Sequence, residues 1–273
     1  MGESPMSTPE STPSAQSTSA QTAPGTVAGE STPTGRTRTV LVIDTATDTV
    51  VTGIGRITTT AGAPECHVVA VRAVADGRRH AEILTSLIAE VLEESGVGRD
   101  GIDAVVVGTG PGPFTGLRVG MATGAGFGDA LDIPVFGVCS LDAIAHDVGR
   151  VSAPGATVLA LTDARRREVY WALYRDGGHT RTRGPEVSAP GVVAEILSDS
   201  GVDAVGGSAA HLRQSGWGGD DPAITVPSVA GLLGAAAIAV TGGQSPPPLL
   251  PLYLRRPDAV ERKDQQPKKV GAS

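Results

Sequence analysis

Apolar residues recur along this chain with two different periods, which separate predicted strands from predicted helices. Residues 40–43 are a short run of strand formers, and residues 50–57 repeat this character after a polar turn, which predicts a hairpin. Residues 66–74 predict a third strand. Within residues 80–94 the apolar side chains recur at helical spacing and Ser95-Gly96 follows as a stop signal, so a helix is predicted.

The same patterns continue through the rest of the chain. We expect strands at residues 102–107, 135–138, 157–162, 168–174 and 202–205, and helices at residues 117–131, 141–148, 192–197 and 229–240. The parts before and after residue 140 are loosely alike, because each opens with strands and carries an aspartate at the first turn, Asp44 or Asp163. This order predicts an α/β fold with duplicated mixed sheets flanked by helices.

Composition suggests where the folded part begins and ends. Residues 1–38 are nearly all Ser, Thr, Pro, Ala, Gly and Gln, so we expect a disordered tail there. Residues 257–273 are polar and charged and are expected to be flexible. Between these tails we expect an N-terminal lobe over residues 39–140 and a C-terminal lobe over residues 141–256.

Charge and cysteine content narrow the classes of function. The formal net charge of −7 opposes binding of nucleic acid by the whole chain, so any contact with RNA needs a local basic patch or a partner. Cys66 and Cys139 are the only cysteines, and their spacing indicates neither a disulfide framework nor a zinc site. We expect no export signal, no membrane span and a cytoplasmic location.

A glycine- and proline-rich loop lies at residues 108–116, between a predicted strand and a predicted helix. Such a loop frees backbone N–H groups at a helix N-terminus, an arrangement that suits phosphate. The run lacks the ending of a P-loop and the spacing of a dinucleotide fingerprint. A tight structural turn and a phosphate site therefore both stay open.

Several short segments resemble the TsaB (YeaZ) family in their order and spacing, and together they cover residues 39–256. They are Asp44-Thr45-Ala46-Thr47, His80-Ala81-Glu82, Gly110-Pro111-Gly112-Pro113-Phe114-Thr115-Gly116-Leu117-Arg118, Asp163-Ala164-Arg165-Arg166 with Glu168-Val169-Tyr170, and Tyr253-Leu254-Arg255. Pro113 is a departure, since the family usually has Ser there.

The resemblance implies an actin/Hsp70-like (ASKHA, ribonuclease H-like) fold and a role beside TsaD, the related subunit that transfers threonylcarbamoyl to the adenosine next to the tRNA anticodon. It also implies TsaE as a further partner, ATP use by the wider complex, and tRNA contact mainly through that complex. The catalytic site of TsaD uses two histidines four residues apart on one helix, and this chain has no such pair. We therefore expect a scaffold with no catalytic residue and no metal site.

Two predicted helices are candidates for the partner interface. Glycines recur every fourth residue from Gly116 to Gly128, and this flat stripe must pack against something because interior glycines weaken a helix by about 0.8–1 kcal/mol each. The occupant is either the chain's own sheet or predicted helix at residues 80–94, or a matching helix of TsaD; in a homodimer it is a second copy. The predicted interface residues are His80, Leu84, Leu87, Val91, Gly116, Leu117, Arg118, Gly120, Gly124 and Gly128.

Weak ATP or ADP binding is a second hypothesis. The predicted contacts are Asp44, Thr45, Thr47, Gly110, Gly112, Asp163, Gly206 and Gly207. Acidic turn residues are also common simply because they form Asx turns. The rival functions are an autonomous actin-like ATPase or kinase and a glycoprotease, and the protease is disfavoured because no His-Glu-x-x-His occurs.

Overall fold

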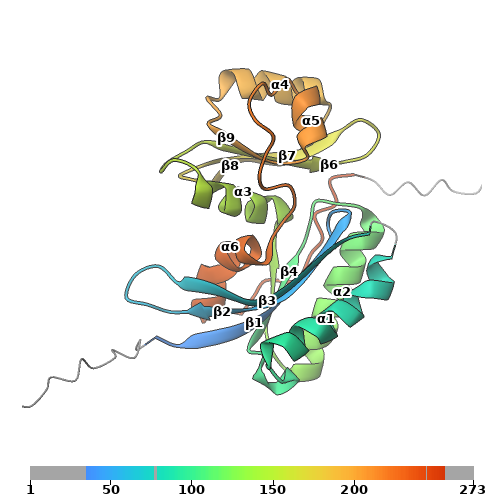
Figure 1. Ribbon diagram of the computed structural model, residues 1–273, viewed down its shortest axis with the longest axis vertical. Helices are drawn as coiled ribbons and strands as arrows, with labels where there is room; N and C mark the ends of the chain where they lie inside the picture. Colours follow the sequence, from blue (N-terminus) through green and yellow to red (C-terminus); the bar gives the residue numbers. More distant parts are fainter. Residues whose placement is uncertain (1–34, 77–78, 244, 256–273) are drawn as a thin grey trace, which may run out of the picture. The chain divides into compact units, whose positions relative to one another are not determined.

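The computed structural model describes residues 35–76, 79–243 and 245–255, which form two mixed sheets with helices on both faces (Figure 1). The first sheet has the strand order β3-β2-β1-β4-β5 and the second has the order β8-β7-β6-β9. The strands are β1 Thr37–Asp44, β2 Thr49–Thr58, β3 Glu65–Ala75, β4 Ala104–Gly108, β5 Val135–Val138, β6 Val158–Asp163, β7 Val169–Arg175, β8 Thr180–Ser188 and β9 Ala204–Gly207. The helices are α1 His80–Ser95, α2 Phe114–Leu131, α3 Ser140–Val151, α4 Pro190–Asp199, α5 Ala209–Gln214 and α6 Val229–Thr241, with a short 3-10 turn η1 at Arg99–Gly101.

Strand β1 is central because it is apolar on both sides. It pairs antiparallel with β2 and parallel with β4. Leu41 and Ile43 belong to the core under α1 and α2, whereas Val40 and Val42 belong to the core under α6. A strand that is covered on both faces has a continuous apolar sequence, so the sequence pattern predicted β1 correctly.

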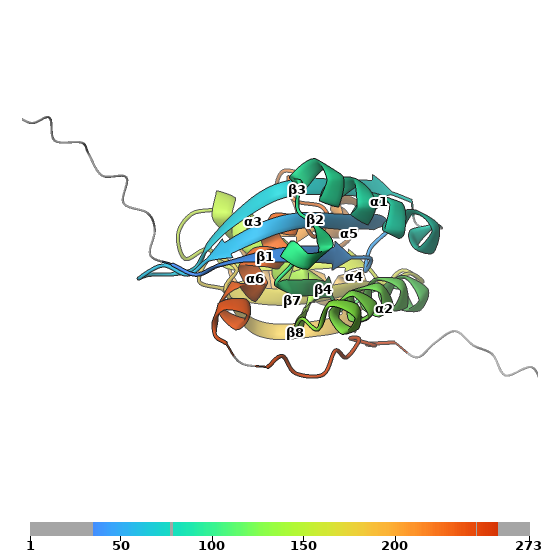
Figure 2. The same ribbon diagram turned by 90° about the horizontal axis from the view of Figure 1, so that it is seen from below.

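The helices and sheets alternate in layers, which Figures 1 and 2 show from two directions. Helices α1 and α2 cover one face of the first sheet, and α6 covers the other. Helix α3 packs against α6 and against the second sheet, whose far face is covered by α4 and α5. Each sheet is thus buried on both faces.

The two sheets have the same strand topology. In each, the first three strands are antiparallel neighbours, and the next strand pairs parallel with the first. Asp44 ends β1 and Asp163 ends β6, as predicted. The prediction of a duplicated α/β fold of the actin/Hsp70-like class is confirmed.

Several elements differ from the sequence prediction. Strand β8 and helix α5 were missed, because β8 is a polar edge strand and α5 is too short to show a periodicity. Helix α2 begins at Phe114, inside the predicted loop. Helix α6, which falls in the predicted lobe of residues 141–256, packs against the first sheet.

The predicted tails lie mostly outside the described residues, which start at residue 35 and end at residue 255. Thr37 and Arg38, assigned to the N-terminal tail, instead begin β1. The lobe boundary at residue 140 stays a prediction. Within the described part of the chain, no helix combines the length and apolar character needed to cross a membrane.

Candidate functional site

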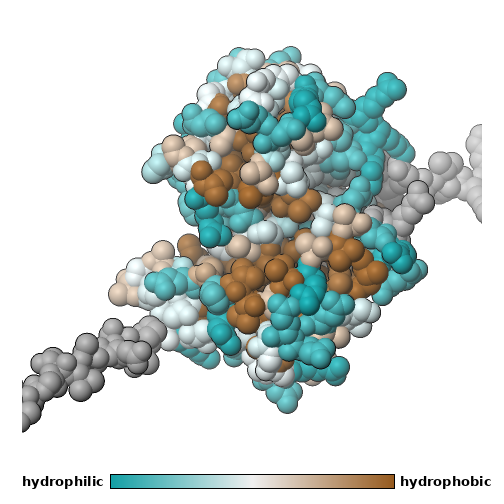
Figure 3. All heavy atoms as spheres, in the orientation of Figure 1, coloured by the Kyte–Doolittle hydropathy of each residue, from teal (hydrophilic) through white to brown (hydrophobic). Residues whose placement is uncertain are grey.

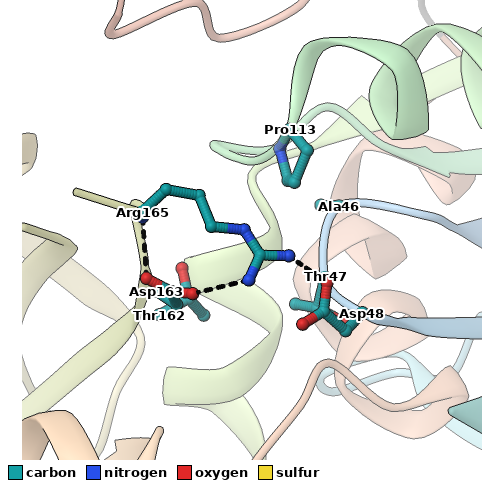
Figure 4. A pocket seen from close by; sticks show the side chains of 7 residues that line it. All are labelled: Ala46, Thr47, Asp48, Pro113, Thr162, Asp163 and Arg165. Carbon is teal, nitrogen blue, oxygen red and sulfur yellow. Dashed lines mark hydrogen bonds and ion pairs between the residues drawn. The ribbon is translucent and has the colours of Figure 1, made fainter. Parts of the chain in front are cut away.

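The ends of β1 and β6 carry Asp44 and Asp163, two of the predicted nucleotide contacts, and they meet at the junction between the two sheets. A small cavity of about 40 Å³ lies there, and its lining comes from the turn after β1, the start of α2 and the end of β6 (Figure 4). The lining residues are Ala46, Thr47, Asp48, Pro113, Thr162, Asp163 and Arg165. Ligand pockets usually measure about 300–1,000 Å³, so this cavity is small and has room for one or two water molecules.

Arg165 bridges the junction. Its Nη2 lies 2.6 Å from Asp48 Oδ1 and its Nη1 lies 3.0 Å from Asp163 Oδ2, so the guanidinium joins the two turns (Figure 4). The backbone N–H of Arg165 also donates to Asp163 Oδ1 at 2.7 Å. The Asp163 carboxylate is therefore engaged by the chain's own groups.

The turn that carries Arg165 has an unusual backbone. Arg165, Arg166 and Arg167 have φ values of 61°, 53° and 63°, so three successive residues with side chains occupy the left-handed region. This conformation costs about 1–2 kcal/mol per residue. Arg255 secures the turn, because its Nη1 donates to the Ala164 carbonyl at 2.7 Å and its Nη2 pairs with Glu168.

Asp44 lies on the other side of the junction and is fully buried. Its Oδ2 accepts a hydrogen bond from Ser140 Oγ at 2.6 Å, and its Oδ1 accepts one from the Ala46 N–H at 2.9 Å. Burial raises its pKa from 3.8 to about 6, although these two hydrogen bonds oppose the rise. The structure gives Asp44 the Asx-turn role that was the alternative to ligand binding.

The other predicted nucleotide contacts also serve packing. The Thr45 hydroxyl donates to the Gly116 carbonyl at 2.7 Å and accepts from the Gly120 N–H at 3.1 Å. The Thr47 hydroxyl hydrogen-bonds to the backbone of Thr49 at 3.2 Å.

The four glycines of the nucleotide hypothesis lie where chain segments approach closely. A Cβ on Gly112 would lie 2.1 Å from the Ala46 carbonyl oxygen, and one on Gly110 would lie 2.9 Å from the Leu117 side chain. A Cβ on Gly206 would lie 2.6 Å from Ile144, and Gly207, with φ 109°, lies against the backbone of Leu161. Nucleotide binding by these residues stays a prediction, and their packing gives each of them a structural role.

The glycine stripe of α2 faces the chain's own sheet. A Cβ on Gly124 would meet Val107 Cγ2 at 2.3 Å, and one on Gly128 would meet Val135 Cγ2 at 2.3 Å. On Gly120 it would meet Thr45 Oγ1 at 2.3 Å, and on Gly116 it would meet the Thr45 carbonyl oxygen at 2.6 Å. Of the alternatives considered, the sheet occupies the stripe, and these glycines are not open to a partner.

The apolar residues of the predicted interface set are buried in the same way. Leu84, Leu87, Val91 and Leu117 all belong to the core between α1, α2 and the first sheet. The apolar stripe on α1 is wide because the sheet and α2 both pack against it. A partner interface at these residues stays a prediction.

His80 and Arg118 complete the predicted interface. His80 is buried beside Gly116, and its Nε2 has no hydrogen-bond partner among the described residues. Arg118 is exposed, with its guanidinium 3.8 Å from the centre of the Phe114 ring and its Nε donating to the Tyr253 hydroxyl at 3.0 Å. Arg118 is thus the one side chain of the set that reaches the surface.

The outward face of α2 was not predicted from the sequence. Ala122, Gly126 and Ala130 are exposed and recur every fourth residue, offset by two from the buried glycine stripe. A Cβ on Gly126 would meet no atom within 4 Å. With Phe127 and η1, this face lines an open depression of about 590 Å³. The repeat of small residues was the signal that could have revealed it.

The described residues contain no group of three or more His, Cys, Asp or Glu side chains that could hold a metal ion.

Known proteins are similar to this chain in sequence and in fold. Residues 74–202 match the family described as TsaD, tRNA N6-adenosine threonylcarbamoyltransferase. An uncharacterized protein of Mycobacterium tuberculosis is 47% identical over 224 residues, which are 81% of this chain and 93% of that protein. TsaB of Escherichia coli, named for tRNA threonylcarbamoyladenosine biosynthesis, is 36% identical over 124 residues, which are 44% of this chain and 53% of that protein.

The structure of YeaZ from Pseudomonas aeruginosa is similar, with a TM-score of 0.61 and 27% identity over 80% of this chain and all of that one. Fold and site together define an actin/Hsp70-like protein of two mixed sheets whose junction is closed by its own side chains. The chain belongs to the TsaB (YeaZ) family.

Proposed function

We propose that this chain takes part in forming threonylcarbamoyladenosine in tRNA, as a non-catalytic scaffold subunit that binds TsaD. The Escherichia coli relative named for this pathway and the match to a TsaD family support the proposal. A chain that resembles TsaD can pair with it as two copies of one fold pair in a homodimer.

The observation that carries the proposal is the outward face of α2. Ala122, Gly126 and Ala130 leave a flat strip on which another helix can pack closely, and Phe127 beside it supplies apolar contact. Gly126 weakens α2 by about 0.8–1 kcal/mol and meets no neighbour that compensates for this cost. Close packing by a TsaD helix provides a reason for glycine at this position.

The closed junction supports the non-catalytic part of the proposal. A kinase or ATPase of this fold class must admit a nucleotide between its two halves, and here the space is about 40 Å³. In the assembly, ATP is used by the partners, including TsaE, and tRNA is contacted mainly through the complex.

A reconstituted reaction tests this function. The chain is added to its cognate TsaD, TsaE, threonylcarbamoyl-AMP, ATP and tRNA, and the modified nucleoside is measured after digestion of the tRNA. We expect modification only when TsaD and this chain are both present. Equal modification with and without the chain contradicts the proposal, and modification by the chain without TsaD shows that it is an enzyme.

A further inference from the structure

A second cavity, far larger than the one at the junction, lies where β3, α3, α6 and the turn between β7 and β8 meet. Its volume is about 390 Å³, within the range of small-ligand sites. Its lining includes Val68, His146, Arg150, His179, Ala237 and Ile238. No residue of the proposed TsaD surface is among them.

One wall of this cavity is apolar. Val68, Ala237 and Ile238 come from β3 and α6, and Ile238 is 79% exposed although it is a large hydrophobic side chain. Figure 3 shows further hydrophobic surface gathered over the region of β3, where Val71 is exposed. An apolar group bound here would cover surface that the chain itself leaves exposed to water.

The opposite wall carries hydrogen-bond donors and no carboxylate. The rings of His146 and His179 lie edge to face, with their centres 5.1 Å apart. His146 lies flat against Gly234, because a Cβ there would be 2.1–2.6 Å from three atoms of the ring. This packing fixes the ring, yet its Nδ1 is buried and has no hydrogen-bond partner among the described residues.

The permanent charge in this wall belongs to Arg150. The nearest approach to its neighbour Asp147 is 3.9 Å, which is longer than a hydrogen bond, while Asp147 Oδ2 accepts from Ser228 Oγ at 2.6 Å. The guanidinium can therefore still take a carboxylate in a bidentate contact. Burial first, then the nearby His179 and Arg150, lower the pKa of His146 to about 4, so at neutral pH its ring is an uncharged donor and acceptor.

We propose that this cavity binds a small organic carboxylate, with its acid group on Arg150 and an imidazole N–H and its apolar body on Val68, Ala237 and Ile238. A carboxylate suits the site better than inorganic phosphate, because most of the lining is apolar and favours burial of a hydrocarbon body. Arg150 sets the preference for an acid over its amide.

Benzoate is the probe, with benzamide as its uncharged analogue and inorganic phosphate as an anion without an apolar body. The full chain, labelled in its histidine rings, is titrated with each while NMR follows the signals. We expect benzoate to shift the ring signals of His146 and His179 to saturation. Benzamide and phosphate should each bind at least about tenfold more weakly.

Two variants separate the contributions of charge and apolar contact to binding. Arg150→Gln should weaken the binding of benzoate about tenfold and leave the binding of benzamide unchanged, whereas Ile238→Ala should weaken the binding of both. Arg99→Gln removes an exposed arginine from η1 and should change neither. The proposal is overturned if benzoate moves neither histidine, or if Arg150→Gln binds benzoate as well as the wild type does.

Discussion

The Ser140 hydroxyl donates a 2.6 Å hydrogen bond to the Asp44 carboxylate, and this contact joins the end of β1 to the first residue of α3. The two residues are 96 positions apart in the sequence. Because Asp44 is fully buried, this contact ties the first sheet to the helix that packs on the second sheet.

Asp44 should make the stability of the fold depend on pH. Its pKa is raised from 3.8 to about 6, so between these values the folded chain holds more protons than the unfolded chain, and stability falls as pH rises. Asp44→Asn stays neutral and keeps an acceptor for the Ala46 N–H. Relative to wild type, the variant should gain up to about 3 kcal/mol between pH 4 and pH 8.

Urea unfolding of both proteins at the two pH values measures this gain. Titrations of all other groups are shared, so the difference between the proteins isolates Asp44. If that difference is the same at pH 4 and pH 8, the carboxyl does not titrate in the way its burial implies.

The two glycine-bearing faces of α2 should respond oppositely to a large side chain. Gly124→Leu places a side chain against Val107, where even a Cβ lies at 2.3 Å, and should cost about 1–3 kcal/mol or more. Gly126→Leu meets no neighbour and removes an interior helix glycine, so stability should rise by up to about 1 kcal/mol. Thermal unfolding of the isolated chain distinguishes them, and a destabilised Gly126→Leu would mean that this face is packed.

Tyr253 should anchor the C-terminal segment to α2. Its ring stacks on Phe114 with centres 4.8 Å apart, and its hydroxyl accepts from Arg118. Tyr253→Ala removes both contacts and should cost about 1 kcal/mol, whereas Tyr253→Phe keeps the stack and should cost less than half of that. Equal losses in a denaturant titration would show that the hydroxyl, not the ring, holds the segment.

The bridge made by Arg165 should contribute little to stability. Arg165 and Asp48 each have 56% of the side chain exposed, and exposed ion pairs usually contribute less than about 1 kcal/mol. The free energy of unfolding of Arg165→Ala should therefore lie within about 1 kcal/mol of that of Arg167→Ala, the matched control on the same turn. A loss of several kcal/mol would mean that the bridge, and not the core around α3 and α6, holds the sheets together.

The central strands could be predicted because burial on both faces leaves a continuous apolar run, as in Val40 to Ile43. Strand β8 could not, because Thr180 to Arg183 are polar residues at the edge of a sheet. The places of Asp44 and Asp163 at the ends of equivalent strands could be predicted, because each residue follows an apolar run. The contact of Arg165 with Asp48 across the junction could not be predicted, because the two residues are 117 positions apart.

The sequence could not show which face of α2 is free, and the reason is physical. Helix α2 carries two stripes of small residues, one through Gly124 and one through Gly126. Glycine and alanine carry too little hydropathy to tell the core from the surface, so the sequence pattern alone did not show which stripe faces inward. The packing of Gly124 on Val107 shows that the stripe through Gly124 faces inward.

Association with TsaD tests the account most directly. The purified chain is mixed with its cognate TsaD and the complex is measured by light scattering and titration, with wild type beside Gly126→Leu. Gly191→Leu is the control, since Gly191 is an exposed glycine in α4 whose Cβ also meets nothing within 4 Å. We predict a one-to-one complex for wild type and Gly191→Leu, and at least about tenfold weaker binding for a folded Gly126→Leu. No association of the wild type, or equal binding by all three proteins, would contradict the account.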